Sequence, residues 1–431
     1  MRVLMFGWEF PPHIAGGLGT ACYGMTKGLA ANGVEVMFVM PSASGDEDQS
    51  AVKILNASDT PIIEDVSMDV ASYVEKVQFY KIGSNLIPYA DPEDFAKIIE
   101  NEKRLEDKEF RIQYGKKYKF SGKYGANLME EVARYAMAGA TLAMEHAGEF
   151  DVIHAHDWLT YLAGIAAKKI SGKPLVVHMH ATSFDRGSES QIDSRVYGLE
   201  KRGMEEADMV IAVSELTRNI CINKYGISPD KVVAVHNAVD FSGRSALQVQ
   251  RGVKDKVVTF LGRVTYQKGP EYFIEAAAKV LKRTTNVRFV MAGSGDLLNK
   301  CIKHVAQLGI SDRFHFTGFL RGADVNKMFA LSDVYVMPSI SEPFGISPLE
   351  AMQTNVPSII SKQSGCAEIL SYALKVDFWD VDAMADAIYG LLQYPALSHF
   401  ASTYGYDEVN SLKWNAAAAK IKAVYESVVN K

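Results

Sequence analysis

Short apolar runs recur along the whole chain, separated by more polar stretches. One series of runs ends near residue 239, and a second series begins near residue 256. The runs fall at residues 2–7, 34–40, 151–156, 174–180, 208–214 and 231–239, and then at 256–262, 287–293, 313–319, 333–339 and 356–362. Continuous apolar strands that alternate with helices are typical of parallel sheets covered on both faces. The pattern therefore predicts an α/β fold.

Segments of helical periodicity lie between the runs. The clearest are Thr20–Asn32, Asn127–His146 and Pro270–Lys282. Residues 241–255 (FSGRSALQVQRGVKD) are polar and contain two glycines, so they separate the two series. We predict two Rossmann-like parallel-sheet domains facing across a cleft, at residues 1–245 and 246–400.

Two further segments interrupt the alternation of runs and helices. Residues 85–125 include a charged, tyrosine-containing tract and are predicted to form a helical insertion in the first domain. Residues 401–431 have a helical pattern with no strand after it. We expect this last segment to cross back to the first domain.

Composition narrows the function classes. The chain has 431 residues, 48% of them apolar, which is more than one core usually holds. A net charge of -5 argues against nucleic-acid binding. No apolar stretch reaches the ~18 residues of a membrane span, and the N-terminal run is too short for a signal peptide. The four cysteines lie far apart, so neither a disulfide framework nor a zinc site is indicated. We expect a cytoplasmic protein.

Unusual residues follow several of the apolar runs, where ligands bind in open α/β sheets. After the first run, Gly16 and Gly17 precede an amphipathic helix, so backbone amides there could approach an anion. The spacing is not that of a dinucleotide-binding loop, and a plain glycine turn explains it equally well.

The stretch HAHDW, residues 154–158, ends the third run. His154 and His156 share one face of the predicted strand, and Asp157 is predicted to cap the next helix. His156 is placed to hydrogen-bond a sugar hydroxyl. No third ligand at suitable spacing indicates a metal site.

The loop GRVTYQKGP, residues 262–270, carries two cations after a strand. Arg263 can bind a diphosphate through two N–H groups and Lys268 as a point charge. Pro270 is predicted to open the next helix.

The stretch SEPFGISPLE, residues 341–350, predicts a helix start with Ser347 as cap and Glu350 at the third helical position. Free N–H groups at Gly345–Ser347 would face a bound phosphate, and Glu342 would lie near its sugar. Farther on, Asp380 and Asp382 are predicted to cap a helix rather than to bind a metal.

Taken together, these motifs are those of a known family. EPFGISPLE resembles the E-x7-E motif of retaining nucleotide-sugar glycosyltransferases of the GT-B architecture, and PPHIAGGL, HAHDW, HATSFDR, NAVD, GRVTYQKG and AGSG accompany it in order. The resemblance spans nearly the whole chain. HAHDW and the doubled glycine are most similar to the glycogen and starch synthases.

The resemblance implies transfer of glucose from ADP-glucose or UDP-glucose to the non-reducing end of an α-1,4-glucan, with retention and without a bound metal or cofactor. It implies these catalytic residues: His156, Arg263, Lys268 and Glu342. It implies these donor-binding residues: Gly16, Gly17, Gly293, Gly295, Phe344, Gly345, Ile346, Ser347 and Glu350. Residues on the acceptor or sugar side would be Asp157, Trp158, His180, Thr182, Arg186 and Asn237. It assigns no protein nucleophile.

One departure keeps alternatives open. Ile14 stands where bacterial glycogen synthases usually have lysine, a form closer to the broader group with mannosyl- and sucrose-type enzymes. Another nucleotide sugar with a lipid-linked, small-molecule or protein-glycan acceptor is therefore the alternative enzyme. A non-catalytic sugar-binding protein of the same fold is a third hypothesis. An epimerase is less consistent with the motifs, and a phosphorylase would be much longer. The sequence leaves the oligomeric state open.

Overall fold

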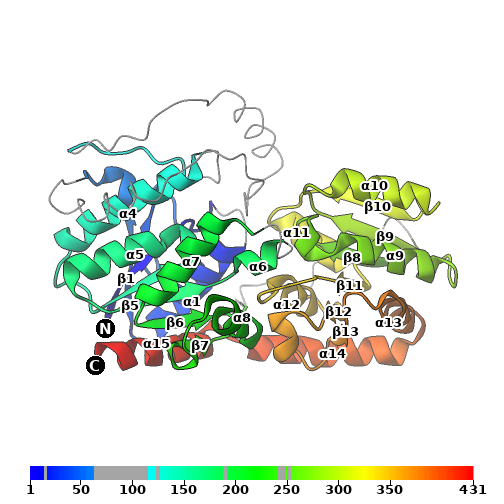
Figure 1. Cartoon of the computed structure of the whole chain (residues 1–431). Coiled ribbons are helices and arrows are strands. Elements are labelled where there is room, and N and C mark those ends of the chain that lie inside the picture. Colours follow the sequence, from blue (N-terminus) through cyan, green and yellow to red (C-terminus); the bar gives the residue numbers. More distant parts are fainter. Residues whose placement is uncertain are drawn as a thin grey trace.

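The computed structural model describes residues 1–13, 17–62, 115–122, 127–187, 192–239, 249, 252 and 254–430. Two parallel α/β sheets form its two halves, which lie side by side (Figure 1). Two parallel-sheet halves are the architecture expected from the sequence.

The first sheet has seven strands in the order β3-β2-β1-β4-β5-β6-β7, all parallel. Its strands are β1 (Arg2–Phe6), β2 (Glu35–Met40), β3 (Lys53–Asn56), β4 (Val152–His156), β5 (Leu175–Met179), β6 (Met209–Ala212) and β7 (Val232–Ala234). The central strands are buried along their length, which explains why they appear in the sequence as continuous apolar runs.

The second sheet has six parallel strands in the order β10-β9-β8-β11-β12-β13. They are β8 (Lys256–Leu261), β9 (Val287–Ala292), β10 (Phe314–Gly318), β11 (Val334–Met337), β12 (Ser358–Ser361) and β13 (Leu374–Val376). The strand order reverses between β1 and β4 in the first sheet and between β8 and β11 in the second. Ligands bind at such switch points in open α/β sheets.

Helices cover both faces of each sheet. In the first half they are α1 (Gly17–Ala31), α4 (Leu128–Glu145), α5 (Trp158–Ser171), α6 (Ser183–Arg186), α7 (Ser194–Glu206) and α8 (Glu215–Tyr225), with short 3-10 turns η1 (Ala57–Asp59) and η3 (Pro229–Lys231). In the second half they are η4 (Tyr266–Lys268), α9 (Pro270–Leu281), α10 (Leu298–Gln307), α11 (Ala323–Leu331), α12 (Ile346–Gln353), η5 (Gly365–Glu368), α13 (Val381–Gln393) and α14 (Pro395–Ser411). The last helix is α15 (Trp414–Val429). No helix in the described ranges is long and apolar enough to cross a membrane.

Alternate residues of each strand face opposite cores. In the first half, Leu4 and Ile153 pack under α4, α5 and α7, while Val3 and Val152 pack under α1 and α15. His154 and His156 follow Val152 at intervals of two, so their side chains lie on the α1 and α15 face.

The final helix packs on the first half of the molecule (Figure 1). A Cβ on Gly24 of α1 would lie 2.1 Å from Trp414 Nε1, and one on Gly28 would lie 2.5 Å from the Trp414 carbonyl oxygen. Lys422 donates a hydrogen bond to the Asn32 carbonyl oxygen at 2.9 Å. The two glycines therefore let α15 approach α1 closely.

Every strand predicted from an apolar run is present, although residues 235–239 leave the sheet after β7. The edge strands β3 and β13 were not predicted. The proposed boundary near residue 245 lies outside the described residues, as does most of the proposed insertion at 85–125. The division into domains therefore stays a prediction.

Candidate active site

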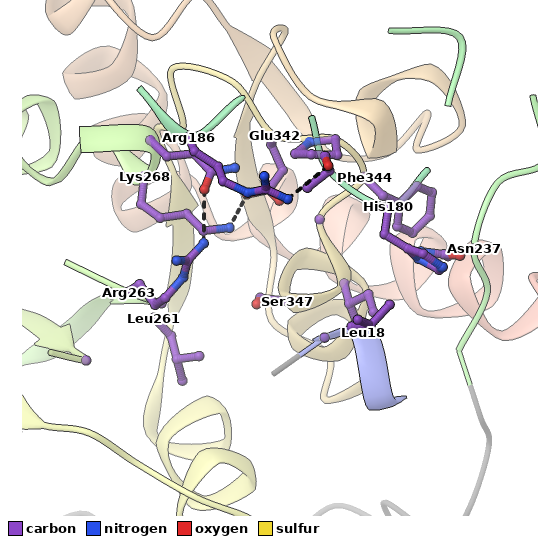
Figure 2. A pocket seen from close by; sticks show the side chains of 18 of the residues that line it. Leu18, His180, Arg186, Asn237, Leu261, Arg263, Lys268, Glu342, Phe344 and Ser347 are labelled. Carbon is purple, nitrogen blue, oxygen red and sulfur yellow. Dashed lines mark hydrogen bonds and ion pairs between the residues drawn. The ribbon is translucent and has the colours of Figure 1, made fainter. Parts of the chain in front are cut away.

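A cavity of about 260 Å³ opens between the two sheets, at the carboxyl ends of strands β5, β8 and β9 (Figure 2). Several predicted site residues line it: Gly17, His180, Arg186, Asn237, Arg263, Lys268, Gly293, Glu342, Phe344, Gly345, Ile346 and Ser347. Others do not line it: His156, Asp157, Trp158, Thr182, Gly295 and Glu350. Gly16 lies outside the described residues. Both halves of the chain therefore contribute walls to one cavity.

The two cations of the 262–270 loop lie on one side of this cavity (Figure 2). Lys268 ends η4, and Gly269, at φ 62°, leads into α9, which begins at Pro270 as predicted. Arg263 Nη2 donates to Gln267 Oε1 at 3.0 Å. Lys268 forms an ion pair with Glu342, whose side chain is 8% exposed. In this structure the Glu342 carboxylate thus holds the Lys268 ammonium.

Helix α12 begins differently from the prediction. Ser347 is not its cap: Gly345 is, at φ 95°, and the helix starts at Ile346. The predicted capping box is therefore wrong, because Gly345 makes the left-handed turn that starts the helix two residues earlier. Ile346 and Ser347 then occupy the first turn, where N–H groups have no partner inside the helix, and Pro348 has no N–H. Both residues line the cavity, at the positive end of the helix.

Two glycines after β9 let the backbone pack closely against the 262–264 loop, which carries Arg263. Gly293 has φ 151°, and a Cβ there would lie 1.8 Å from the Gly262 carbonyl oxygen. A Cβ on Gly295 would lie 2.3 Å from the Val264 carbonyl oxygen. Because no side chain fits at either position, the backbone of the 262–264 loop is fixed against that of the next strand.

The histidine that reaches the cavity is His180, which follows β5. His156 is fully buried and its Nδ1 hydrogen-bonds His180 Nε2 at 2.9 Å. Burial lowers the pKa of His180 to about 3, so its ring is neutral at pH 7. Because Nε2 is bonded to His156, the neutral ring offers the cavity its other nitrogen, Nδ1, as a donor or an acceptor without charge. Direct contact of His156 with a sugar stays a prediction.

Comparison with known proteins assigns the family. Residues 2–234, more than half of the chain, match the family described as starch synthase catalytic domain, and residues 246–408 match glycosyl transferases group 1. The chain belongs to the GT-B glycosyltransferases of group 1.

Relatives and solved structures agree with this assignment. An uncharacterized glycosyltransferase of Methanocaldococcus jannaschii is 29% identical over 387 residues, covering 86% of this chain and 83% of the relative. The glycogen synthase of Mycobacterium tuberculosis is 23% identical over 439 residues, covering 99% and 94%. The catalytic domain of starch synthase IV from Arabidopsis thaliana, solved with ADP and acarbose, has a TM-score of 0.66 at 15% identity and covers 100% and 99%. The glycosyltransferase is thus a distant homologue of glycogen synthase.

In this glycosyltransferase Asp157 orients the segment that carries His180. Asp157 is the N-cap residue of α5, as predicted, but its carboxylate makes no hydrogen bond to that helix. It accepts instead from the N–H of His180 at 2.7 Å and of Ala181 at 3.4 Å. Its φ of 56° is unusual for a residue other than glycine and turns the carboxylate toward β5. Asp157 therefore acts on the cavity through the backbone of its wall.

Burial raises the pKa of Asp157 to about 7, an effect that Arg186 partly offsets. A raised carboxyl pKa stabilises the fold at low pH, and this contribution is lost as the pH rises toward 7. We expect Asp157→Asn to keep both backbone hydrogen bonds and to remove this loss. Between pH 5 and pH 8 the free energy of unfolding of the wild type should fall by roughly 3 kcal/mol relative to the variant. Urea unfolding at several pH values measures the difference, and parallel curves would contradict the assignment.

Three residues that the sequence analysis missed support the wall beside Arg186. Thr182 donates to Asp185 at 2.7 Å through both its N–H and its hydroxyl, and Ser341 of the second half donates to Asp185 at 2.6 Å. Arg186 pairs with the fully buried Glu200 at 3.1 Å. The spacing Thr182–x–x–Asp185 is a capping-box signal that could have identified Asp185. Ser341 and Glu200 could not be found because their partners are distant in sequence.

The glycine-containing stretch that follows β12 joins the two halves directly. Glu368 accepts from the N–H groups of Glu215 at 2.9 Å and Leu216 at 2.8 Å, in the first turn of α8, and hydrogen-bonds His236 at 2.6 Å. Ser214 donates to the Pro343 carbonyl oxygen at 2.6 Å. These contacts hold the 341–345 loop of the second half against the first.

The sequence offered no third metal ligand at HAHDW, but the fold brings in further donors from β5. His154, His156 and His178 each place one ring nitrogen within 4.8 Å of the others, and so do the donor atoms of a second group formed by Cys22, His156 and His180.

The predicted helix cap at Asp380 is present at the start of α13. Asp380 accepts a hydrogen bond from the Ala383 N–H at 2.9 Å, which confirms the prediction.

Proposed function

We propose that this glycosyltransferase moves glucose from ADP-glucose or UDP-glucose to the non-reducing end of an α-1,4-glucan, with retention of the anomeric configuration. The observation that carries the proposal is the convergence of Arg263, Lys268 and the first turn of α12 on one cavity between the two halves. Cations and helix N-termini are the groups that proteins use to bind diphosphates.

On the donor side, Arg263 and Lys268 would bind the diphosphate and stabilise the negative charge that develops as it leaves. The N–H groups of Ile346 and Ser347 would bind the distal phosphate. Glu350 would bind the ribose hydroxyls; it lies on α12, beyond the residues that line the cavity.

On the sugar side, Glu342 would accept hydrogen bonds from glucose hydroxyls, and His156 with His180 would hold the 6-hydroxyl. Because Glu342 is paired with Lys268 in this structure, the donor must reorganise that pair: its phosphates attract the ammonium and its hydroxyls occupy the carboxylate. One ion pair thus couples recognition of the two ends of the donor.

The bond exchange needs no protein nucleophile. The acceptor hydroxyl would attack the anomeric carbon from the face that the diphosphate leaves, while a departing phosphate oxygen takes the hydroxyl proton. The role of the protein is then to position the reactants and stabilise charge. The glycogen synthase and starch synthase relatives support glucose and a glucan as substrates.

Ile14 favours one alternative, a transferase of the same fold with another nucleotide sugar and a non-glucan acceptor. The two functions differ in what they consume. The purified protein is therefore incubated with ADP-glucose or UDP-glucose, each with and without glycogen, and the released nucleoside diphosphate is measured.

We expect glycogen-dependent release of one nucleoside diphosphate and a product that α-amylase digests. Arg288 lies on β9 and outside the cavity lining. Arg288→Met removes its ion pair with Asp255 and should behave as wild type. If both glucose donors stay intact while GDP-mannose is consumed with another acceptor, glucan synthesis is excluded and the alternative holds.

A further inference from the structure

A row of four histidines lies on one face of the first sheet. His154 and His156 come from β4, and His178 and His180 belong to β5 and its end; His156 and His178 are register partners. Their rings are in mutual contact, with centroids 4.2 Å apart for His154 and His156 and 5.4 Å apart for His156 and His178. Only His180 lines the cavity, and the proposed transfer reaction uses His156 behind it but gives no role to His154 and His178.

In two of these rings, one nitrogen makes a hydrogen bond. Tyr425 of α15 hydrogen-bonds His154 Nδ1 at 2.7 Å, and His180 hydrogen-bonds His156 Nδ1 at 2.9 Å. Within the described part of the chain, His154 Nε2, His156 Nε2 and both nitrogens of His178 have no hydrogen-bond partner. All three side chains are almost completely buried.

Such an arrangement is costly unless something occupies it. A buried polar atom without a partner costs about 1–3 kcal/mol, and here four of them come together. Burial lowers the pKa of His154 to about 3 and those of His156 and His178 well below the usual value, so the rings are neutral. Neutral imidazole is the form that binds metal ions.

We propose that His154, His156 and His178 form a binding site for a divalent transition-metal ion of the zinc class. One ring nitrogen of each already lies within 4.8 Å of the others. Zinc-bound nitrogens are about 3.3 Å apart, so small ring rotations would complete the site. The bonds from Tyr425 and His180 are the outer contacts that usually orient metal-bound histidines.

Nearby carboxylates offset the charge of the ion. Cys22 of α1 forms the second donor group with His156 and His180, and Glu9 and Asp157 both act on its thiol, raising its pKa beyond the effect of burial. Glu9 is buried and accepts from the Gly19 N–H at 3.1 Å. Glu9 and, when it is deprotonated, Asp157 thus place negative charge near the histidine row, which a cation requires in an apolar core.

The site would be structural, since none of its three ligands lines the cavity. It would join β4 and β5 beneath α15 and fix the ring of His156, whose partner His180 is part of the cavity wall. The metal would occupy His156 Nε2, so direct contact with the sugar 6-hydroxyl would fall to His180. The test below measures metal content and does not depend on the substrate.

The test is metal content. The full chain, produced without a histidine tag, is equilibrated with Zn²⁺, dialysed and measured by elemental analysis. We expect about one zinc per chain, a higher melting temperature with zinc than with chelator, and visible absorption of tetrahedral Co²⁺ when cobalt replaces zinc.

Two variants and a control locate the ion. Tyr425→Phe should weaken zinc affinity about 10–100-fold through loss of an outer contact. His178→Asn should lose the ion, and His304→Gln on α10, far from the row in the sequence and paired with Glu275, should keep it. If the wild type retains no zinc and its stability is the same with chelator, the proposal is wrong and water molecules satisfy the histidines. That result does not require any variant to fold.

Discussion

Replacing Lys268 by methionine should lower turnover about a hundredfold to a thousandfold, the usual cost of removing one donor to a developing negative charge. Methionine keeps much of the length of the side chain and removes only the ammonium. Because the charge of the departing diphosphate grows in the transition state, the loss should fall on kcat more than on KM.

Lys268 also holds the largely buried Glu342, so stability must be separated from chemistry. The variant leaves Glu342 with Ser339 as a donor, and we expect about 1–3 kcal/mol less stability. The double variant Lys268→Met, Glu342→Gln removes the unpaired charge and should recover stability without recovering turnover. Lys279→Met, at an exposed pair with Asp382 on the neighbouring helix, is the matched control. A near-normal kcat in Lys268→Met would remove this residue from the mechanism.

The second large effect is expected at Gly293, where alanine should both destabilise the second half and abolish measurable transfer. Its Cβ would overlap the Gly262 carbonyl oxygen at 1.8 Å, and the φ of 151° is unfavourable for alanine. Overpacking and backbone strain together should cost about 3 kcal/mol or more. The loop that carries Arg263 would have to move.

Chemical unfolding and turnover under the same conditions measure the effect. The control is Gly198→Ala in α7, where no atom lies within 4 Å of the added Cβ and φ is not in the left-handed range. There alanine should be neutral or stabilising by about 0.5–1 kcal/mol. Equal stabilities of the two variants would show that the 262–264 loop can accommodate a side chain at residue 293.

The sequence predicted all the central strands and the edge strands β7 and β10, but it missed the edge strands β3 and β13. Central strands such as β1 and β4 are buried on both faces and so appear as continuous apolar runs. The edge strand β3 is only partly buried, and β13 has three residues with one exposed position, so neither leaves a distinct pattern. Their pairing depends on the neighbouring strand, which no local pattern records.

The sequence identified separate loops of the site, but not how their side chains lie relative to one another. The position of unusual residues after strands indicated the loops of Arg263 and Glu342, and the family resemblance indicated His180. The structure brings these three residues to one cavity. These sequence signals could not show that His156 lies behind His180, because this depends on the pairing and register of β4 and β5, which the sequence does not reveal. The cap of α12 was misassigned because the preference of Ser347 for caps was outweighed by the left-handed turn at Gly345.

The packing of α15 on α1 has a consequence for how the chain is made. Val3 and Met5 of the first strand share a core with Ile421 and Tyr425 of the last helix. During synthesis β1 leaves the ribosome long before α15 exists, so the part of this face that α15 covers stays exposed while the second half is translated. Completion of the first half therefore depends on a helix that is made only after the second half.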